Sequence, residues 1–94
     1  MTFEIRWSEN ARSSFRQVID QIRDKWTDKE VSEFIQKTNR ILEVISKSPL
    51  IYQSTQFPNV RRAVISKQTS VLYKVSGNYI EVLFFWDNRQ DPIF

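Results

Sequence analysis

The chain opens with a short stretch in which hydrophobic and polar residues alternate. Within residues 2–7 the hydrophobic side chains are Phe3, Ile5 and Trp7, and a polar residue separates each from the next. A period of two is typical of a strand with one buried face. We therefore expect a half-buried strand at the start of the chain.

Residues 8–48 carry two hydrophobic stripes with helical spacing. Ser8 can cap the first helix by accepting a hydrogen bond from its first turn, and Thr27 and Glu30 have the spacing of a capping box for the second. The first stripe is Ala11, Phe15, Val18, Ile19, Ile22 and Trp26. The second stripe is Val31, Phe34, Ile35, Thr38, Ile41, Leu42 and Ile45. The very short connection at Thr27 predicts an antiparallel helical hairpin, and the second helix should end before Pro49.

Residues 50–59 have the pattern of a loop, and three strands are expected after it, at residues 60–65, 70–76 and 79–86. Gly77-Asn78 fits a two-residue hairpin turn between the last two strands. That turn predicts a register that pairs Val75 with Ile80, Lys74 with Glu81, Tyr73 with Val82 and Val71 with Phe84. The opposite charges of Lys74 and Glu81 support this register.

The strand at residues 79–86 is hydrophobic on both faces, as a strand covered on both sides is. We therefore place it inside the sheet and the N-terminal strand at an edge. The order of elements is one strand, two helices and three strands. Helices grouped ahead of an antiparallel meander predict a single α+β domain over residues 1–94, with the helical hairpin on one face of the sheet.

Alternation divides the predicted sheet into two faces. The face expected to hold the helices carries Val71, Tyr73, Val75, Ile80, Val82, Phe84 and Trp86. The other face carries Leu72, Lys74, Glu81, Leu83 and Phe85, joined by Arg61 and Ala63 if a four-residue loop links the first two meander strands, and by Asp87 and Arg89 if the last strand continues. An uncovered hydrophobic centre with arginines around it indicates a binding surface. The alternative is that the loop at residues 50–59 covers Leu83 and Phe85.

Composition narrows the chemistry that this domain can perform. With 40% hydrophobic residues it can build a core, but with no cysteine and no histidine it lacks disulfides and the usual zinc ligands. Gly77 is the only glycine, so a phosphate-binding glycine loop is excluded. We expect no metal, no cofactor, no membrane segment and a cytoplasmic location. The net charge of +3 favours approach to nucleic acid or to an acidic protein.

Any catalysis would have to use arginine, lysine, tyrosine or aspartate side chains. Metal-free RNA cleavage can do so, because a proton acceptor activates the 2′-hydroxyl while arginines stabilise the charged transition state. The candidate side chains are Arg61, Arg62, Lys67, Tyr73 and Arg89. We expect Tyr73 to be a core residue instead, because its face points at the helices.

The C-terminal segment resembles a known family. The run Phe84-Phe85-Trp86-Asp87-Asn88-Arg89-Gln90-Asp91-Pro92 is similar to the C-terminal signature of RelE/ParE-family toxins of bacterial type II toxin–antitoxin systems. Further similarities follow the family's order at Ser48-Pro49-Leu50, Asn59-Val60-Arg61-Arg62 and Val71-Leu72-Tyr73-Lys74-Val75. The resemblance spans the chain and implies a β-α-α-β-β-β toxin domain that a cognate antitoxin wraps and neutralises, in a possible hetero-oligomer.

The resemblance implies two alternative mechanisms. RelE-like members cut messenger RNA on the ribosome with strand lysines and arginines and a tyrosine near the end, whereas ParE-like members poison DNA gyrase. Carried over to this chain, Arg61 and Arg89 match two catalytic positions, while Ala63 and Ser70 stand where the family has charged residues. The sequence ends at Phe94 without the terminal tyrosine. This comparison of residues favours the hypothesis that the chain is a gyrase poison and is not an enzyme.

Three hypotheses remain open from the sequence. The chain is a ParE-like gyrase poison, a RelE-like ribosome-dependent endoribonuclease that uses Arg61, Lys67 and Arg89, or an inactive relative that keeps only antitoxin binding. The residues expected to bind an antitoxin or a target are Arg61, Leu72, Lys74, Leu83, Phe85, Asp87 and Arg89.

Overall fold

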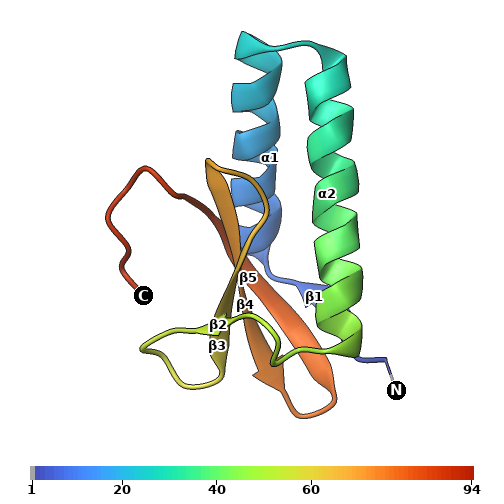
Figure 1. Cartoon of the computed structure of the whole chain (residues 1–94), viewed down its shortest axis with the longest axis vertical. Helices are drawn as coiled ribbons and strands as arrows, with labels where there is room; N and C mark the ends of the chain where they lie inside the picture. The colour runs from blue at the N-terminus through green and yellow to red at the C-terminus, as the bar shows by residue number, and fades with distance from the viewer. Residues whose placement is uncertain (1) are drawn as a thin grey trace.

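The computed structural model describes residues 2–94, which form a five-stranded sheet with a helical hairpin on one face (Figure 1). The elements in chain order are β1 (Glu4–Trp7), α1 (Glu9–Lys25), α2 (Asp28–Lys47), β2 (Gln53–Ser54), β3 (Val60–Val64), β4 (Thr69–Ser76) and β5 (Tyr79–Asp87). The predicted α+β architecture is confirmed. The addition is β2, a two-residue strand inside the segment predicted as a loop.

Both helices begin at the predicted caps. Ser8 Oγ accepts from the Ala11 N–H at 3.0 Å, and the Thr27 N–H donates to the Glu30 carboxylate at 3.0 Å. The second helix ends at Lys47, ahead of Pro49 as predicted. Neither helix combines the length and apolarity needed to cross a membrane, a finding that applies to residues 2–94.

The strand order in the sheet is β1-β5-β4-β3-β2, so the predictions that the last strand lies inside the sheet and the N-terminal strand at an edge are confirmed. β1 runs parallel to its neighbour β5, and the other strand pairs are antiparallel. The turn between β4 and β5 uses Gly77 at φ +54°, a left-handed conformation that glycine adopts without strain. We call the side that packs on the helices the front face and the opposite side the back face.

A β-bulge in β5 corrects the predicted assignment of faces. Near the turn the pairs Val75–Ile80, Lys74–Glu81 and Tyr73–Val82 are as predicted, but Leu72 pairs with Phe84 and Val71 with Phe85. One extra residue, Leu83, therefore stands in β5 opposite the step from Leu72 to Tyr73. Because a one-residue slip reverses every later side chain, Phe85 faces the helices and Phe84 and Trp86 face the back. The predicted faces of these three residues are wrong for this reason.

Helix α1 satisfies the β5 backbone where the bulge lies. β1 ends opposite Val82, so β5 has no strand neighbour on that side beyond this residue. Two serines take the strand's place: Ser8 Oγ donates to the Leu83 carbonyl at 2.8 Å, and the Phe85 N–H donates to Ser14 Oγ at 2.9 Å. The backbone groups of β5 at the bulge therefore have side-chain partners, as buried backbone groups require.

The register of β3 also differs from the prediction. Ile65 N–H donates to the Thr69 carbonyl at 2.9 Å, so the connecting turn has three residues where four were assumed. Arg61 consequently pairs with Tyr73, and Ala63 pairs with Val71. Both lie on the front face, and the prediction that they join the opposite face is wrong because the shorter turn reverses the alternation.

The core lies between the front face and the helices. Phe85 is 6% exposed, and its ring lies 5.4 Å from that of Trp7 and 5.0 Å from that of Phe15. Tyr73 is fully buried there, as predicted, and its hydroxyl donates to the Pro49 carbonyl at 2.6 Å. Helix α2 contributes Phe34, Leu42 and Ile45 to the same core.

Candidate functional site

The residues predicted to bind a partner do not form one patch. Leu72 and Lys74 belong to the back face, and Leu72 is fully buried there. Leu83 is half-buried at the bulge. Arg61, Phe85, Asp87 and Arg89 lie on the front side of the sheet, and Phe85 is part of the core. The idea of a single hydrophobic patch ringed by arginines is therefore wrong in its geometry, because it rested on an unbroken alternation along β5.

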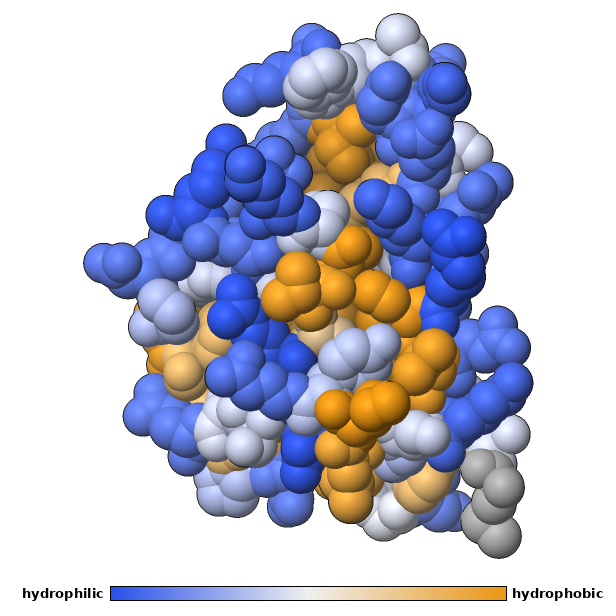
Figure 2. Space-filling model, viewed as in Figure 1, coloured by the Kyte–Doolittle hydropathy of each residue, from blue (hydrophilic) through white to orange (hydrophobic). Residues whose placement is uncertain are grey.

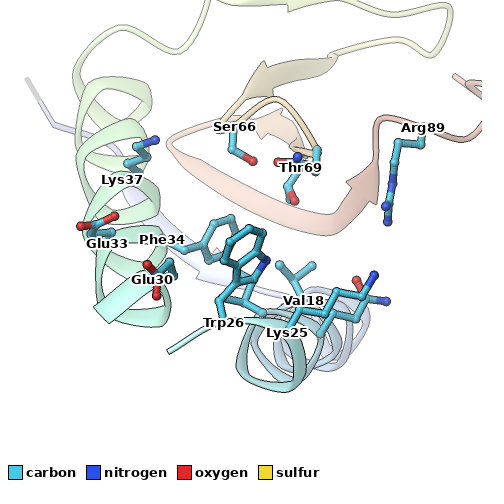
Figure 3. Close-up of a pocket in the computed structure, with 13 residues that line it drawn as sticks. Val18, Lys25, Trp26, Glu30, Glu33, Phe34, Lys37, Ser66, Thr69 and Arg89 are labelled. Carbon is cyan, nitrogen blue, oxygen red and sulfur yellow. The ribbon is translucent and has the colours of Figure 1, made fainter. Parts of the chain in front are cut away.

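The structure instead presents a groove of about 540 Å³ between the helical hairpin and the turn that joins β3 to β4. Figure 3 shows side chains from both helices, from this turn and from the segment after β5 pointing into it. The lining residues are Val18, Gln21, Ile22, Lys25, Trp26, Glu30, Glu33, Phe34, Lys37, Ser66, Gln68, Thr69 and Arg89. Arg89 is the predicted site residue that the groove contains.

The groove has a hydrophobic floor and a charged rim. Trp26 is 63% exposed, although it is a large aromatic residue, and its indole stands beside Phe34 in the groove (Figure 3). Lys25, Lys37 and Arg89 supply positive charge at the rim, and Glu30 and Glu33 supply negative charge. Figure 2, which has the view of Figure 1, shows that hydrophobic side chains continue down the middle of this face from the hairpin to the lower end of the molecule, with polar residues around them. Exposed hydrophobic surface with a polar rim is typical of an interaction site.

Asp87 fixes the guanidinium of Arg89 at the end of this groove. Arg89 Nε donates to Asp87 Oδ1 at 3.0 Å, and Arg89 Nη2 donates to Oδ2 at 2.8 Å. The side-chain hydrogen bonds from Arg89 are the main cause that lowers the pKa of Asp87 to about 2. A bidentate pair of this kind orients the guanidinium as well as attracting it.

Arg61 has a different structural setting. Its Nη1 donates to the carbonyls of Leu50 at 3.2 Å and Tyr52 at 2.8 Å, which anchors the segment after α2 to β3. It borders a second hollow of about 300 Å³, lined also by Leu50, Thr55, Phe57 and Val75. The residues that surround Arg61 all belong to the segment around β2 or to the sheet.

The three candidates for RNA cleavage do not converge. Arg61 is opposite Tyr73, whereas Asp87, the partner of Arg89, is opposite Thr69, four positions away along β4. That separation is about 13 Å along the strand. Lys67 is exposed in the turn between β3 and β4 and lines neither hollow. Burial raises the pKa of Tyr73 to about 12, and its hydroxyl already donates to Pro49, so this phenol is unsuited to proton transfer.

A polar network on the back face was not foreseen. Arg62 Nε donates to Ser70 Oγ at 3.0 Å, and Arg62 Nη2 donates to Asn88 Oδ1 at 2.9 Å. Asn88 Nδ2 in turn donates to the Ser66 carbonyl at 3.2 Å, which ties the end of β5 to the turn after β3. Arg62 was recognised only as a candidate cation, and the position of Asn88 inside the C-terminal signature was the available signal.

Comparison with known proteins gives matches among solved structures alone, since no family model and no curated protein matches the sequence. A chain of the chromosomal ParDE toxin–antitoxin system of P. aeruginosa superposes with a TM-score of 0.79 at 13% identity, covering 92% of this chain and 96% of that chain. The E. coli DinJ–YafQ toxin–antitoxin complex gives 0.65 at 11% identity, covering 95% and 96%. The YoeB dimer of Staphylococcus aureus gives 0.63 at 15% identity, covering 89% and 94%.

These likenesses cover nearly the whole chain and concern proteins of toxin–antitoxin systems. The chain therefore has the RelE/ParE-type toxin fold, and the resemblance seen in the sequence is confirmed at the level of the fold. At sequence identities this low, the comparison shows the fold of this chain and does not show its activity.

Proposed function

We propose that this protein is the toxin of a bacterial type II toxin–antitoxin pair, which arrests growth in the cytoplasm until a cognate antitoxin neutralises it. The observation that carries this proposal is the match of fold over nearly the full length to a chain of a ParDE system, at a TM-score of 0.79. The sequence signature at Trp86 to Pro92 supports the proposal independently of the fold. The same segment supplies Arg89 to the groove.

For the mechanism we favour a toxin that binds a large target such as DNA gyrase and does not cut RNA. The support is geometric. Arg61 is engaged by two backbone carbonyls, Arg89 by Asp87, and Tyr73 by a buried hydrogen bond. General acid–base catalysis needs a proton donor or acceptor within reach of the reacting group, and the sheet holds Arg61 and Arg89 apart. RelE-like cleavage by Arg61, Lys67 and Arg89 is the alternative that the experiments must exclude.

The front groove is our candidate for the antitoxin's binding site. Its hydrophobic floor of Val18, Ile22, Trp26 and Phe34 suits an apolar partner surface. Its rim, with three cations and the two carboxylates of Glu30 and Glu33, suits a partner with charged residues beside that surface. Binding of an antitoxin there would cover the exposed indole of Trp26. A toxin–antitoxin hetero-oligomer follows from this proposal.

Expression in a bacterial host tests the toxin role. Induction of this chain alone should stop growth, and co-expression of the protein encoded by the adjacent reading frame should restore growth. Undisturbed growth at high levels of folded protein would contradict the toxin role.

A single substitution tests the groove. Trp26→Ala should leave the melting temperature nearly unchanged, because the side chain is 63% exposed, while weakening the complex with the adjacent-frame protein by about 10-fold or more, the loss typical of an interface aromatic. Lys29→Ala, an exposed substitution in α2 that does not line the groove, is the matched control. Equal affinity of wild type and Trp26→Ala would move the antitoxin site elsewhere.

A further inference from the structure

The segment after β5 is exposed along most of its length and returns to the back face at Phe94. In Figure 1 the chain leaves β5, arcs away from the sheet and turns back toward it at the C-terminus. Residues 91–94 have no regular secondary structure. Asp91, Pro92 and Ile93 are exposed, whereas Phe94 is half-buried. A half-buried residue at the tip of an exposed segment indicates a specific contact.

The contact is made by the ring of Phe94. It meets the indole of Trp86 edge-to-face, with ring centroids 5.6 Å apart and planes at 84°. The guanidinium carbon of Arg62 lies 5.4 Å from the centroid of the same ring. Gln56 Nε2 also donates to the Ile93 carbonyl at 3.1 Å, which anchors the backbone beside the ring. Aromatic pairs and cation–π contacts of this geometry are attractive but individually weak.

The receiving surface is held by contacts that do not involve the segment that covers it. Arg62 is held in place by Ser70 and Asn88, as described above. Trp86 is fixed on β5, where it pairs with Ser70 of β4 and packs against Phe84 with centroids 6.2 Å apart. Its indole Nε1 is buried, and among residues 2–94 it has no hydrogen-bond acceptor. A buried donor without a partner is unusual in a protein core. This surface therefore offers a ligand one hydrogen-bond donor, the Trp86 indole N–H, that the Phe94 ring does not use.

We propose that residues 91–94 form a detachable strap, whose Phe94 ring occupies an aromatic-binding site made by Trp86 and Arg62 on the back face. The occupant for which this site is built is an extended peptide segment with an aromatic side chain, and the strap is its tethered form. A partner segment of the same chemistry takes the site when the strap leaves, and its backbone carbonyl can accept from the Trp86 indole. A short flexible tether holds the strap at an effective concentration of roughly millimolar, so a competing segment must bind more tightly than the isolated strap does.

This site is separate from the front groove, because Trp86 and Arg62 lie on the opposite face of the sheet from Thr69, Phe34 and Arg89. This proposal and the toxin role can therefore be tested independently of each other. The C-terminal segment acts as a regulatory cover, because it protects the back face until a partner exchanges with it.

Nuclear magnetic resonance of the tryptophan indole N–H groups tests the strap. The chain has three tryptophans, so Trp86→Phe assigns the signal of interest by its loss. In the Phe94→Ala variant the Trp86 signal should move, and its exchange with solvent should accelerate by roughly 2- to 10-fold, the factor that corresponds to an aromatic contact of ordinary strength. Ile93→Ala is the matched control, because that side chain is 61% exposed and the carbonyl that binds Gln56 remains. The control should leave the Trp86 signal in place.

Exchange of the occupant is tested in trans. A chain that ends after Gln90 should show the displaced Trp86 signal, and a peptide of residues 90–94 should return it toward the full-chain position with saturation, whereas the same peptide with Phe94→Ala should not. An unchanged Trp86 signal in Phe94→Ala would overturn the proposal, and this variant remains decisive if the shortened chain fails to fold. A displaced signal that several millimolar peptide does not restore would also overturn it, because the segment would then be a fixed part of the fold.

Discussion

Phe85 and Trp86 are neighbours in the sequence but lie on opposite faces of the sheet. Phe85 is enclosed by aromatic rings of β1 and α1, whereas Trp86 is half-buried on the back face under Phe94. Phe85→Ala should therefore lower the free energy of unfolding by about 3–5 kcal/mol, the usual range for a buried aromatic. Trp86→Ala should lower it by clearly less. Urea denaturation of both variants measures the difference, and an equal or larger loss for Trp86→Ala would contradict the faces described here.

The Asp87–Arg89 pair makes stability depend on acid. The pKa of Asp87 is about 2 in the folded protein and about 3.9 in an unfolded chain. A carboxylate with a lowered folded pKa contributes stability that is fully present above about pH 4 and is lost as the pH falls toward 2. The contribution is modest, because the Arg89 side chain is 63% exposed and solvent screens the pair.

Two substitutions should remove this acid dependence. Asp87→Asn deletes the titrating group, and Arg89→Gln deletes the partner that lowers its pKa. Denaturation series between pH 5 and pH 2 should show a shallower loss of stability for both variants than for the wild type. Parallel curves for all three proteins would mean that the pair does not form in solution.

At the scale of elements, Ser8 connects the start of α1 to the bulge of β5. Its Oγ accepts from Ala11 and donates to the Leu83 carbonyl. Ser8→Ala removes both bonds and should lower the free energy of unfolding by about 1–2 kcal/mol, the upper part of the range for an N-cap. Ser13→Ala, at an exposed position of the same helix, is the control, and we expect it to be neutral or slightly stabilising. Equal effects of the two substitutions would show that the cap is not formed.

The sequence predicts the elements well because each depends on neighbouring residues. The cap at Ser8, the capping box at Thr27 and the turn at Gly77 are local signals, and all three are confirmed. The bulge at Leu83 and the three-residue turn before Thr69 are not encoded locally. The bulge is stabilised by Ser8, the N-cap of α1, and by Ser14 of α1, which are distant in sequence, so alternation along β5 alone could not predict it.

At the scale of the whole molecule, the helical hairpin extends beyond one end of the sheet (Figure 1). A groove lies there between the hairpin and the turn that joins β3 to β4. The groove assembles residues from α1, α2, the turn after β3 and the segment after β5. Of these only Arg89 was expected in a binding site. Trp26 was placed in the hydrophobic stripe of the first helix, and its exposure depends on how far the hairpin extends beyond the sheet. Hydrophobic periodicity along one helix cannot predict an exposure that depends on how the hairpin packs on the sheet.

The two-layer fold also explains why we favour binding over cleavage. Arg61 and Arg89 are anchored at different positions along the sheet by Tyr52 and Asp87, and each anchor stabilises the fold. A catalytic centre requires charged groups that converge on one reacting atom. The anchored arginines can still contribute to binding a large target surface.

Purified protein should be assayed in parallel on gyrase supercoiling and on ribosomes programmed with messenger RNA, because the two proposed mechanisms differ in these activities. A gyrase poison inhibits supercoiling and leaves the message intact, and this is the result we expect. Codon-specific cleavage of the message in the ribosomal A site, abolished by Arg61→Ala or Arg89→Ala, would contradict it and make this protein a ribonuclease.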